Sequence, residues 1–347
     1  MPAANESNAL DLRTAIDGLL DGVSFAELRR ASDRLSAAYR AGPSDGSGSI
    51  RTAHDRLAYL AARLPSTFEA TRAVLGELRG RAPRVRAESL LELGAGPAPG
   101  LWAAERLFPE LSRATHVEVD ADMAQLGRRL LKAGYFDARV ESTWLLRDVA
   151  RARELGTHDL VLVGYVLGEL PASAGDELVD AAWNVTAAAL VIVEPGTPAG
   201  ADRVIRARAR LIDQGGNVAA PCPHAGACPL ASDDWCHFAA RVDRSSVQRR
   251  LKGGSLGYED EKYAYVAVTR GAADRCAARV LRRPVAQSRR VSLRLCTSEG
   301  LSQELVTRRE GERYRAARKT RWGDGWQPAA GEAGDGTGLP AARASTT

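Results

Sequence analysis

Four short apolar runs, each followed by a stretch with helical spacing, constrain this chain more than any other feature. The runs begin at Ser89, Thr115, His158 and Ala189, and each ends in glycine or an acid. Alternating strand and helix signals of this kind are typical of a parallel sheet that helices cover on both faces. The sequence therefore predicts an α/β domain over residues 81–270.

The N-terminal region, residues 1–80, shows helical rather than strand patterns. Ser24 with Glu27, and Ser66 with Glu69, have the spacing of a capping box, in which the two side chains pair with backbone amides of the first helical turn. We expect each serine to begin a helix. No pattern here indicates chemistry, so the region is interpreted as a helical lid or docking surface.

A glycine-rich turn follows the first apolar run and carries Glu92, Gly94 and Gly96. Glycines let the backbone approach a nucleotide-like ligand without a side-chain collision. The second apolar run carries Glu118 and Asp120, at a distance along the chain where an acid accepts hydrogen bonds from ribose hydroxyls. The turn and the acid together predict a site for a nucleoside-containing cofactor.

The spacing of the turn separates two classes of cofactor. Dinucleotide-binding folds have G-x-G-x-x-G, whereas this chain has G-x-G-x-x-x-G from Gly94 to Gly100, interrupted by Pro97 and Pro99. The pattern resembles the first motif of class I methyltransferases, whose loop holds S-adenosyl-L-methionine. The expected fold class is therefore a class I methyltransferase (Rossmann-like) α/β sheet.

The same resemblance implies further cofactor contacts. Glu118 followed by Met123 is similar to the second methyltransferase motif, which makes Glu118 the ribose ligand and Asp120 the competing choice. Asp148 falls where such folds contact adenine, although an aspartate that opens a helix also serves as a cap. Ala98 departs from the family pattern, where many relatives have glycine, and its methyl group is expected to narrow the cofactor site.

The segment after the third run, Gly164 to Pro171, is where a catalytic motif is expected. Nucleobase amino-group methyltransferases carry Asn or Asp followed by two prolines and an aromatic residue here, and that motif is absent. Glu169 has two interpretations, a base or substrate contact and an acid at a helix start. No catalytic residue is assigned.

Three of the five cysteines, Cys222, Cys228 and Cys236, fall in one proline-rich loop at residues 220–240. Such a loop can bring several thiolates to one metal centre, but this spacing does not say which metal. The chain opens with small polar residues rather than an apolar signal segment, so we expect a reducing, cytoplasmic location that disfavours disulfides. The fourth ligand is left open among His224, His237, Cys276 and Cys296.

Charge is distributed unevenly along the chain. Residues 241–321 hold 21 Lys and Arg against 9 Asp and Glu, although the whole chain has a formal charge of only +5. This asymmetry favours a polyanionic partner such as nucleic acid, and solvated basic faces are the alternative. No run approaches the roughly 20 apolar residues of a membrane span.

A basic β module is predicted at residues 282–326, where Tyr314 and Trp322 lie among arginines and lysines. Such a pattern offers phosphate pairing and base stacking to RNA, or forms a solvated basic helix. Residues 327–347 are rich in Ala, Gly and Thr, and we expect a disordered tail.

Several segments together resemble the methyltransferase-like family of mitochondrial small-ribosomal-subunit assembly proteins and their bacterial relatives. The resemblance implies a 4Fe-4S cluster, association with small-subunit ribosomal RNA or the small ribosomal subunit, and a methyltransferase fold with uncertain activity. The segments that carry it are Tyr59–Pro65, Leu93–Pro97, Trp102–Ala104, Ala220–His224, Cys228–Leu230, Asp234–Phe238, Arg244–Ser246, Leu251–Lys252, Tyr258–Lys262 and Arg318–Trp326.

The same resemblance assigns the cluster ligands as Cys222, Cys228, Cys236 and Cys296. Cys296 lies in an alternating strand pattern, as the family's fourth cysteine does, whereas Cys276 lies in a linker rich in Ala and Arg. We expect a monomer that methylates ribosomal RNA. The alternatives are a non-catalytic RNA-binding assembly factor and a zinc-stabilised RNA-binding protein.

Overall fold

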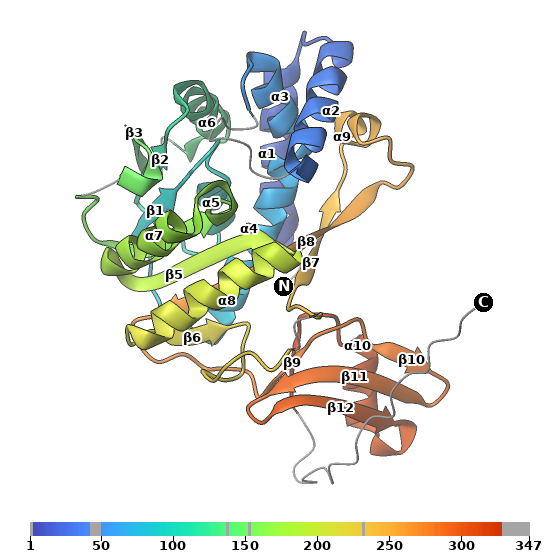
Figure 1. The fold of residues 1–347 in the computed structure, drawn as a ribbon. Helices are drawn as coiled ribbons and strands as arrows, with labels where there is room; N and C mark the ends of the chain where they lie inside the picture. Colours follow the sequence, from blue (N-terminus) through green and yellow to red (C-terminus); the bar gives the residue numbers. More distant parts are fainter. Residues whose placement is uncertain (1–2, 42–49, 137–138, 152–153, 231–232, 328–347) are drawn as a thin grey trace.

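The computed structural model describes residues 3–41, 50–136, 139–151, 154–230 and 233–327. Figure 1 shows an N-terminal group of helices, a large central sheet with helices on both sides, and a smaller second sheet at the C-terminal end. The N-terminal helices are α1 (Ala3–Leu20), α2 (Phe25–Ala41), α3 (Ala53–Ala62) and α4 (Leu64–Arg81).

The helix starts follow the sequence at one predicted position and differ at the other. Helix α2 begins directly after Ser24, as expected. Helix α4 begins at Leu64, two residues before Ser66, because Pro65 is well suited to a first helical turn. The Ser66 hydroxyl donates to Glu259 instead, at 3.1 Å. The capping box formed in this region is at the start of α3, where Thr52 and Asp55 pair reciprocally.

The central sheet has the strand order β3-β2-β1-β4-β5-β8-β6, and β7 pairs with β8. Strands β1 to β5 are parallel, whereas β8 runs antiparallel to β5, β6 and β7. This is the class I methyltransferase fold, as the sequence predicted. The strands are β1 (Ser89–Leu93), β2 (Arg113–Glu118), β3 (Glu141–Leu146), β4 (His158–Gly164), β5 (Thr186–Pro195), β6 (Asn217–Ala220), β7 (Phe238–Asp243) and β8 (Tyr258–Thr269).

Helices cover both faces of this sheet. Helices α4 and α5 pack on one face and α7 and α8 on the other. Side chains of β1 alternate between the two cores, with Leu90 in one and Leu91 in the other, and both are fully buried. Burial on both faces explains why the runs are continuously apolar. The helices are α5 (Pro99–Ala104), α6 (Ala121–Ala133), α7 (Ala172–Asn184), α8 (Pro198–Asp213) and α9 (Ser246–Leu251), with 3-10 turns η2 (Val149–Arg151) and η3 (Leu167–Glu169).

The second sheet forms a C-terminal module with its own apolar core, which helix α10 covers through Ala317. Residues 328–347, which include nearly all of the predicted tail, lie outside the described residues. The elements are β9 (Ala278–Val280), β10 (Val285–Gln287), β11 (Arg290–Thr297), β12 (Gly300–Thr307), η4 (Arg308–Glu310), α10 (Glu312–Lys319) and β13 (Gly325–Trp326).

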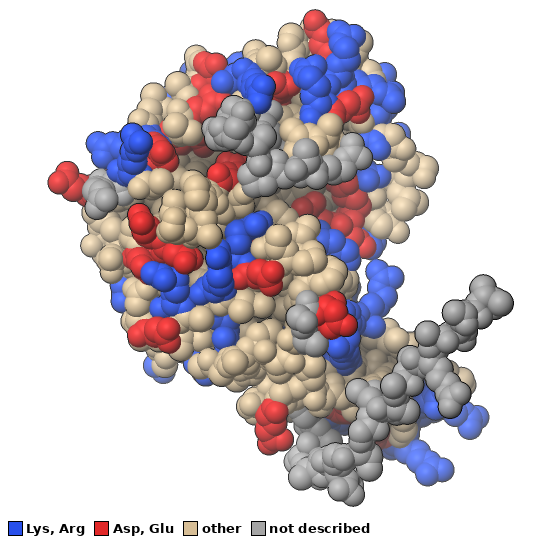
Figure 2. Space-filling model, viewed as in Figure 1, with Lys and Arg blue, Asp and Glu red and all other residues tan. Residues whose placement is uncertain are grey.

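Charged side chains of both signs are intermixed on the face of the larger domain that Figure 2 shows, and basic side chains project from the C-terminal module. Within the parts of the chain that the structure describes, no helix is long and apolar enough to cross a membrane.

Candidate cofactor edge and cysteine cavity

The glycine-rich turn between β1 and α5 depends on backbone conformations that glycine adopts easily. Gly94 has φ of +70° and Gly96 has φ of +53°. A Cβ atom at Gly94 would lie 2.3 Å from Cγ2 of Val166, whereas one at Gly96 would meet nothing within 4 Å. Ala98 is also left-handed, with φ of 62°, and is fully buried. Gly94 therefore has both a conformational and a steric reason to be glycine.

The Glu92 side chain holds the end of the glycine-rich turn through hydrogen bonds. Its buried carboxylate accepts hydrogen bonds from the Gly100 amide at 2.7 Å and the Leu101 amide at 3.3 Å. A ring nitrogen of His116 lies 2.8 Å from the same carboxylate. The carboxylate thus binds the first amides of α5, and its structural role is to hold the turn in position.

Glu118 lies across the turn at the end of β2. Its carboxylate accepts from the Gly96 amide at 2.7 Å and from the Asp120 amide at 2.9 Å. Burial raises the pKa of Glu118, and these amide hydrogen bonds oppose that shift. The structure thus brings Glu118 into contact with the glycine turn, as a ribose ligand requires.

Asp120, the competing choice, has other partners. It is the N-cap of α6, accepting from the Asp122 and Met123 amides, and it pairs with Arg56 of α3 at 2.8 Å. The hydrogen bonds to Arg56 and to the helix hold the pKa of Asp120 below its usual value, against the effect of burial. Asp120 therefore joins the N-terminal helices to the sheet.

Asp148 lies beyond β3 and is exposed. Its carboxylate accepts from the Ala150 amide at 3.0 Å and so caps the short η2 turn. The cap that the sequence offered as the alternative is therefore present. An adenine contact by Asp148 stays a prediction.

Further polar residues gather where β4 and β5 end. Tyr165 follows β4 with φ of 61°, and its hydroxyl oxygen is buried without a hydrogen-bond partner among the described atoms. Desolvation by the surrounding protein, together with the negative charges of Glu118 and Glu194, raises the pKa of the nearby Glu169 to about 7, and part of this residue remains open to solvent. Sequence reasoning missed Tyr165, whose only signal is its place directly after the strand.

Helix α3 lies close to this edge. Burial raises the pKa of Tyr59 to about 12, and the negative charges of Glu169 and Glu118 add to the effect. The carboxyl ends of the parallel strands, together with α3, thus form one polar edge, which we call the cofactor edge: Tyr59, Gly94, Gly96, Glu118, Tyr165 and Glu169.

Four cysteines line a single cavity beside α8. Cys222, Cys228 and Cys236 come from the loop between β6 and β7, and Cys296 comes from β11 of the C-terminal module. Cys276 does not line it; its Sγ lies 3.8 Å from the carbonyl oxygen of Pro221 and is buried. We call this space the cysteine cavity.

Two buried arginines also line the cysteine cavity, and sequence reasoning missed both. Arg208 of α8 donates to the His224 carbonyl at 2.7 Å, and its Nε is buried without a partner among the described atoms. Arg279 of β9 donates to the Pro221 carbonyl at 2.8 Å and pairs with Glu77 at 2.7 Å. Arg208 follows Val204 by four residues on the buried face of α8, a spacing that could have revealed it.

The surroundings of the cavity change the pKa values of its thiols. Burial raises the pKa of Cys222 and Cys236, and that of Cys296 to about 12, so without a bound cation they stay protonated. Arg208 acts in the opposite direction on Cys222. A soft metal centre would replace the protons, and buried guanidinium groups would compensate the charge of the resulting thiolates.

The two histidines of the loop take different positions. His224 lines the cavity with its Nε2 3.5 Å from the Sγ of Cys296. His237 instead stacks on Trp235. Within the described ranges, no three His, Cys, Asp or Glu side chains converge as the ligands of one metal ion do. The cavity does bring together four thiols, which is the donor set that an iron-sulfur cluster uses.

The loop and the C-terminal module are joined around the cavity. Asp234 pairs with Arg294 at 2.8 Å and with Arg282. Trp322 packs edge-on against His237, and the Lys262 ammonium lies 4.0 Å from the centre of the Trp322 ring. Trp322 is therefore partly buried against these residues, and Tyr314 is partly buried against the core of the module, so base stacking by either ring stays a prediction.

The strand order, the glycine turn and the position of Glu118 define a protein of the class I methyltransferase type. The profile of the family described as "Mitochondrial small ribosomal subunit Rsm22" matches residues 53–327. The chain belongs to this Rsm22 family, as the resemblance indicated.

A human relative is named "Ribosome assembly protein METTL17, mitochondrial". It is 31% identical over 289 residues, which are 77% of this chain and 61% of the human protein. This chain thus spans less than two thirds of that relative's length.

Solved structures of methyltransferases are similar in fold. A proposed RNA methyltransferase from Pyrococcus horikoshii is 13% identical with a TM-score of 0.40, covering 69% of this chain and 97% of that one. Magnesium protoporphyrin IX methyltransferase from Synechocystis, with bound S-adenosylhomocysteine, is 12% identical with a TM-score of 0.40, covering 75% and 100%.

Proposed function

We propose that this protein binds S-adenosyl-L-methionine, carries a 4Fe-4S cluster, and acts on small-subunit ribosomal RNA during assembly of the small ribosomal subunit. The observation that carries the proposal is that four cysteines, three from the loop between β6 and β7 and one from β11 of the second sheet, line one cavity with two buried arginines. Membership of the Rsm22 family and the name of the human relative support the ribosomal partner.

The cluster is favoured by the composition of the cavity. A 4Fe-4S cluster takes one thiolate at each of four irons, so its ligands surround a body larger than a single ion. Cys222, Cys228, Cys236 and Cys296 would be those ligands. Arg208 and Arg279 would offset the negative charge of a cluster held by four thiolates. Zinc is the alternative, and it would be held by the same four cysteines.

At the cofactor edge, Gly94 and Gly96 would allow the backbone to approach S-adenosyl-L-methionine, and Glu118 would accept hydrogen bonds from its ribose. The cofactor supplies an electrophilic methyl group. The protein would orient an RNA nucleophile in line with it, and exposed Glu169 is the candidate for holding a proton there. Asp148 is the proposed adenine contact.

We expect the protein to be a monomer in the cytoplasm.

The cluster is tested on protein purified without oxygen. The proposal predicts a brown protein with broad absorption near ~400 nm and about four iron and four sulfide per chain. A colourless protein with stoichiometric zinc would overturn the cluster and favour a zinc-stabilised protein.

Catalysis is tested separately from RNA binding. Glu118→Ala should abolish S-adenosyl-L-methionine binding in calorimetry and methyl transfer to small-subunit RNA, while RNA binding persists. A wild-type protein that binds the RNA but transfers no radiolabelled methyl group would instead identify a non-catalytic assembly factor, which is the second candidate function. The name of the human relative, an assembly protein, favours that candidate.

A further inference from the structure

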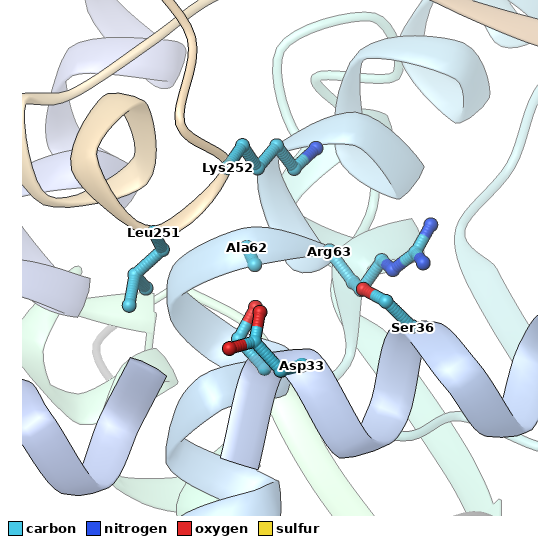
Figure 3. A pocket seen from close by; sticks show the side chains of 7 residues that line it. Asp33, Ser36, Ala62, Arg63, Leu251 and Lys252 are labelled. Atoms are coloured by element: carbon cyan, nitrogen blue, oxygen red, sulfur yellow. The ribbon is translucent and has the colours of Figure 1, made fainter. Parts of the chain in front are cut away.

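A second pocket lies between helix α2, the junction of α3 and α4, and the end of α9 (Figure 3). It has a volume of about 330 Å³. The residues that line it come from three segments that are distant in the sequence: Ser32, Asp33, Ser36, Ala62, Arg63, Leu251 and Lys252.

The lining has the chemistry of an anion site. Arg63 of the α3–α4 junction and Lys252 at the end of α9 each bring a positive charge, and Ser32 and Ser36 of α2 add hydroxyl groups. Guanidinium, ammonium and hydroxyl groups are the side chains that contact phosphate oxygens in nucleic-acid complexes. Asp33 is the one carboxylate among the residues that line the pocket, and its charge would oppose an anion.

The pocket lies at the same end of the molecule as the cofactor edge. Strand β8 is antiparallel to β5, and Tyr263 pairs with Pro195 at the last position of β5. The chain of β7 and β8 extends past that position and carries α9 and Lys252 at its tip. The pocket is therefore beyond the carboxyl ends of the parallel strands, where ligands bind in such sheets.

Helix α3 connects the two sites. The Arg63 amide donates to the Tyr59 carbonyl at 2.8 Å, so Arg63 lies one helical turn beyond Tyr59 of the cofactor edge. Lys252 is held in place by Glu259, which also accepts from Arg244 at 2.8 Å and from Ser66 at 3.1 Å. Both cations thus belong to the framework that adjoins the cofactor edge.

We propose that this pocket binds a backbone phosphate of the RNA substrate and so fixes the strand relative to the cofactor edge. The inference rests on the proposed function, because it takes small-subunit RNA as the ligand. One phosphate is bound between Arg63 and Lys252, with Ser32 and Ser36 as further donors.

The test compares two double variants of the full chain in binding to a small-subunit ribosomal RNA transcript. Arg63→Gln with Lys252→Gln removes the pocket cations. Arg30→Gln with Arg249→Gln is the matched control, since both arginines are exposed, on α2 and α9, and do not line the pocket. Melting temperature and S-adenosyl-L-methionine binding show that each variant is folded.

Loss of one phosphate contact should weaken binding about five- to eightfold at ~0.1 M salt and reduce the slope of log K against log salt by about 0.7 to 0.9. The control should stay within about twofold. Asp33→Asn, which removes an exposed charge, should strengthen binding by about two- to threefold.

Two results would overturn the inference. If the pocket variant weakens RNA binding no more than the control does, or if Asp33→Asn leaves RNA affinity unchanged, no phosphate occupies this pocket. The proposed function is then still supported, provided that the wild-type protein binds the transcript. If the wild-type protein does not bind the transcript, the proposed function fails and this inference fails with it.

Discussion

The cofactor edge and the cysteine cavity are built in opposite ways. At the cofactor edge, backbone amides and positive φ angles determine the geometry, and Glu118 contacts an amide only 22 residues away in the sequence. The cysteine cavity is assembled from side chains, and His224 approaches Cys296 across 72 residues. The glycine turn of the cofactor edge is shaped within one short segment, whereas the cysteine cavity exists only when the cysteine loop and the second sheet are both in place.

This difference predicts different responses to substitution. The glycine turn is sensitive to any substitution that adds a side chain at a residue with positive φ. A site made of distant side chains is lost when a single contributing residue is removed, even one in another sheet.

Cys296→Ala should remove the cluster almost completely, because the fourth thiolate comes only from the C-terminal module. Cys276→Ala is the matched control, since that buried cysteine lies outside the cavity lining. Iron content and visible absorption of anaerobic protein measure both. Equal loss in the two variants would contradict the ligand set.

Arg279→Met should lower the free energy of unfolding by about 3 to 5 kcal/mol, because it leaves Glu77 and two carbonyl groups without their buried partner. Arg275→Met removes one hydrogen bond from an exposed arginine and should cost about 1 kcal/mol. Urea denaturation of both proteins provides the comparison. Similar midpoints would show that Arg279 does not join the two sheets.

Gly94→Ala should destabilise the protein by about 2 to 4 kcal/mol, since a left-handed residue is strained and its Cβ would collide with Val166. Gly96→Ala has the strain without the collision and should cost about 1 to 2 kcal/mol. S-adenosyl-L-methionine affinity should fall more for Gly94→Ala than for Gly96→Ala. The reverse order would contradict the proposed geometry of the turn.

Glu169→Gln should have the smallest effect, seen as a change in pH dependence. The pKa of Glu169 is raised from 4.5 to about 7, so its contribution to stability is present below pH 4.5 and is lost as pH rises through about 7. Glu169→Gln should lack that loss. Because the side chain is exposed, the difference is small, and melting temperatures from pH 5 to 8 measure it.

The contrast between the two sites also explains what the sequence could predict. The strands that begin at Ser89 and His158, and the glycine conformations at Gly94 and Gly96, follow from local patterns. The choice of Cys296 came from the family resemblance, because no local pattern links a residue of β11 to the loop.

The contacts that sequence analysis missed are between residues distant in the chain. Arg279 bridges Glu77 of α4, the cysteine loop and the carbonyl of Gly323, three segments that hydrophobic periodicity does not relate. The predicted helix start at Ser66 was wrong because Pro65 favours an earlier first turn, and the Ser66 hydroxyl donates to Glu259 of β8 rather than capping a helix. Tertiary contacts of this kind override the local helix propensity on which a sequence-based prediction depends.

The place of Cys296 in the chain also sets an order of events during synthesis. Cys236 emerges from the translating ribosome sixty residues before Cys296. At about 5 to 20 residues per second, the three loop cysteines are synthesised several seconds before Cys296 and the rest of β11. A nascent chain truncated ahead of β11 would lack the fourth thiol of the cavity. A cluster held by all four cysteines would therefore be completed only after the C-terminal module is made, rather than when the methyltransferase fold is complete.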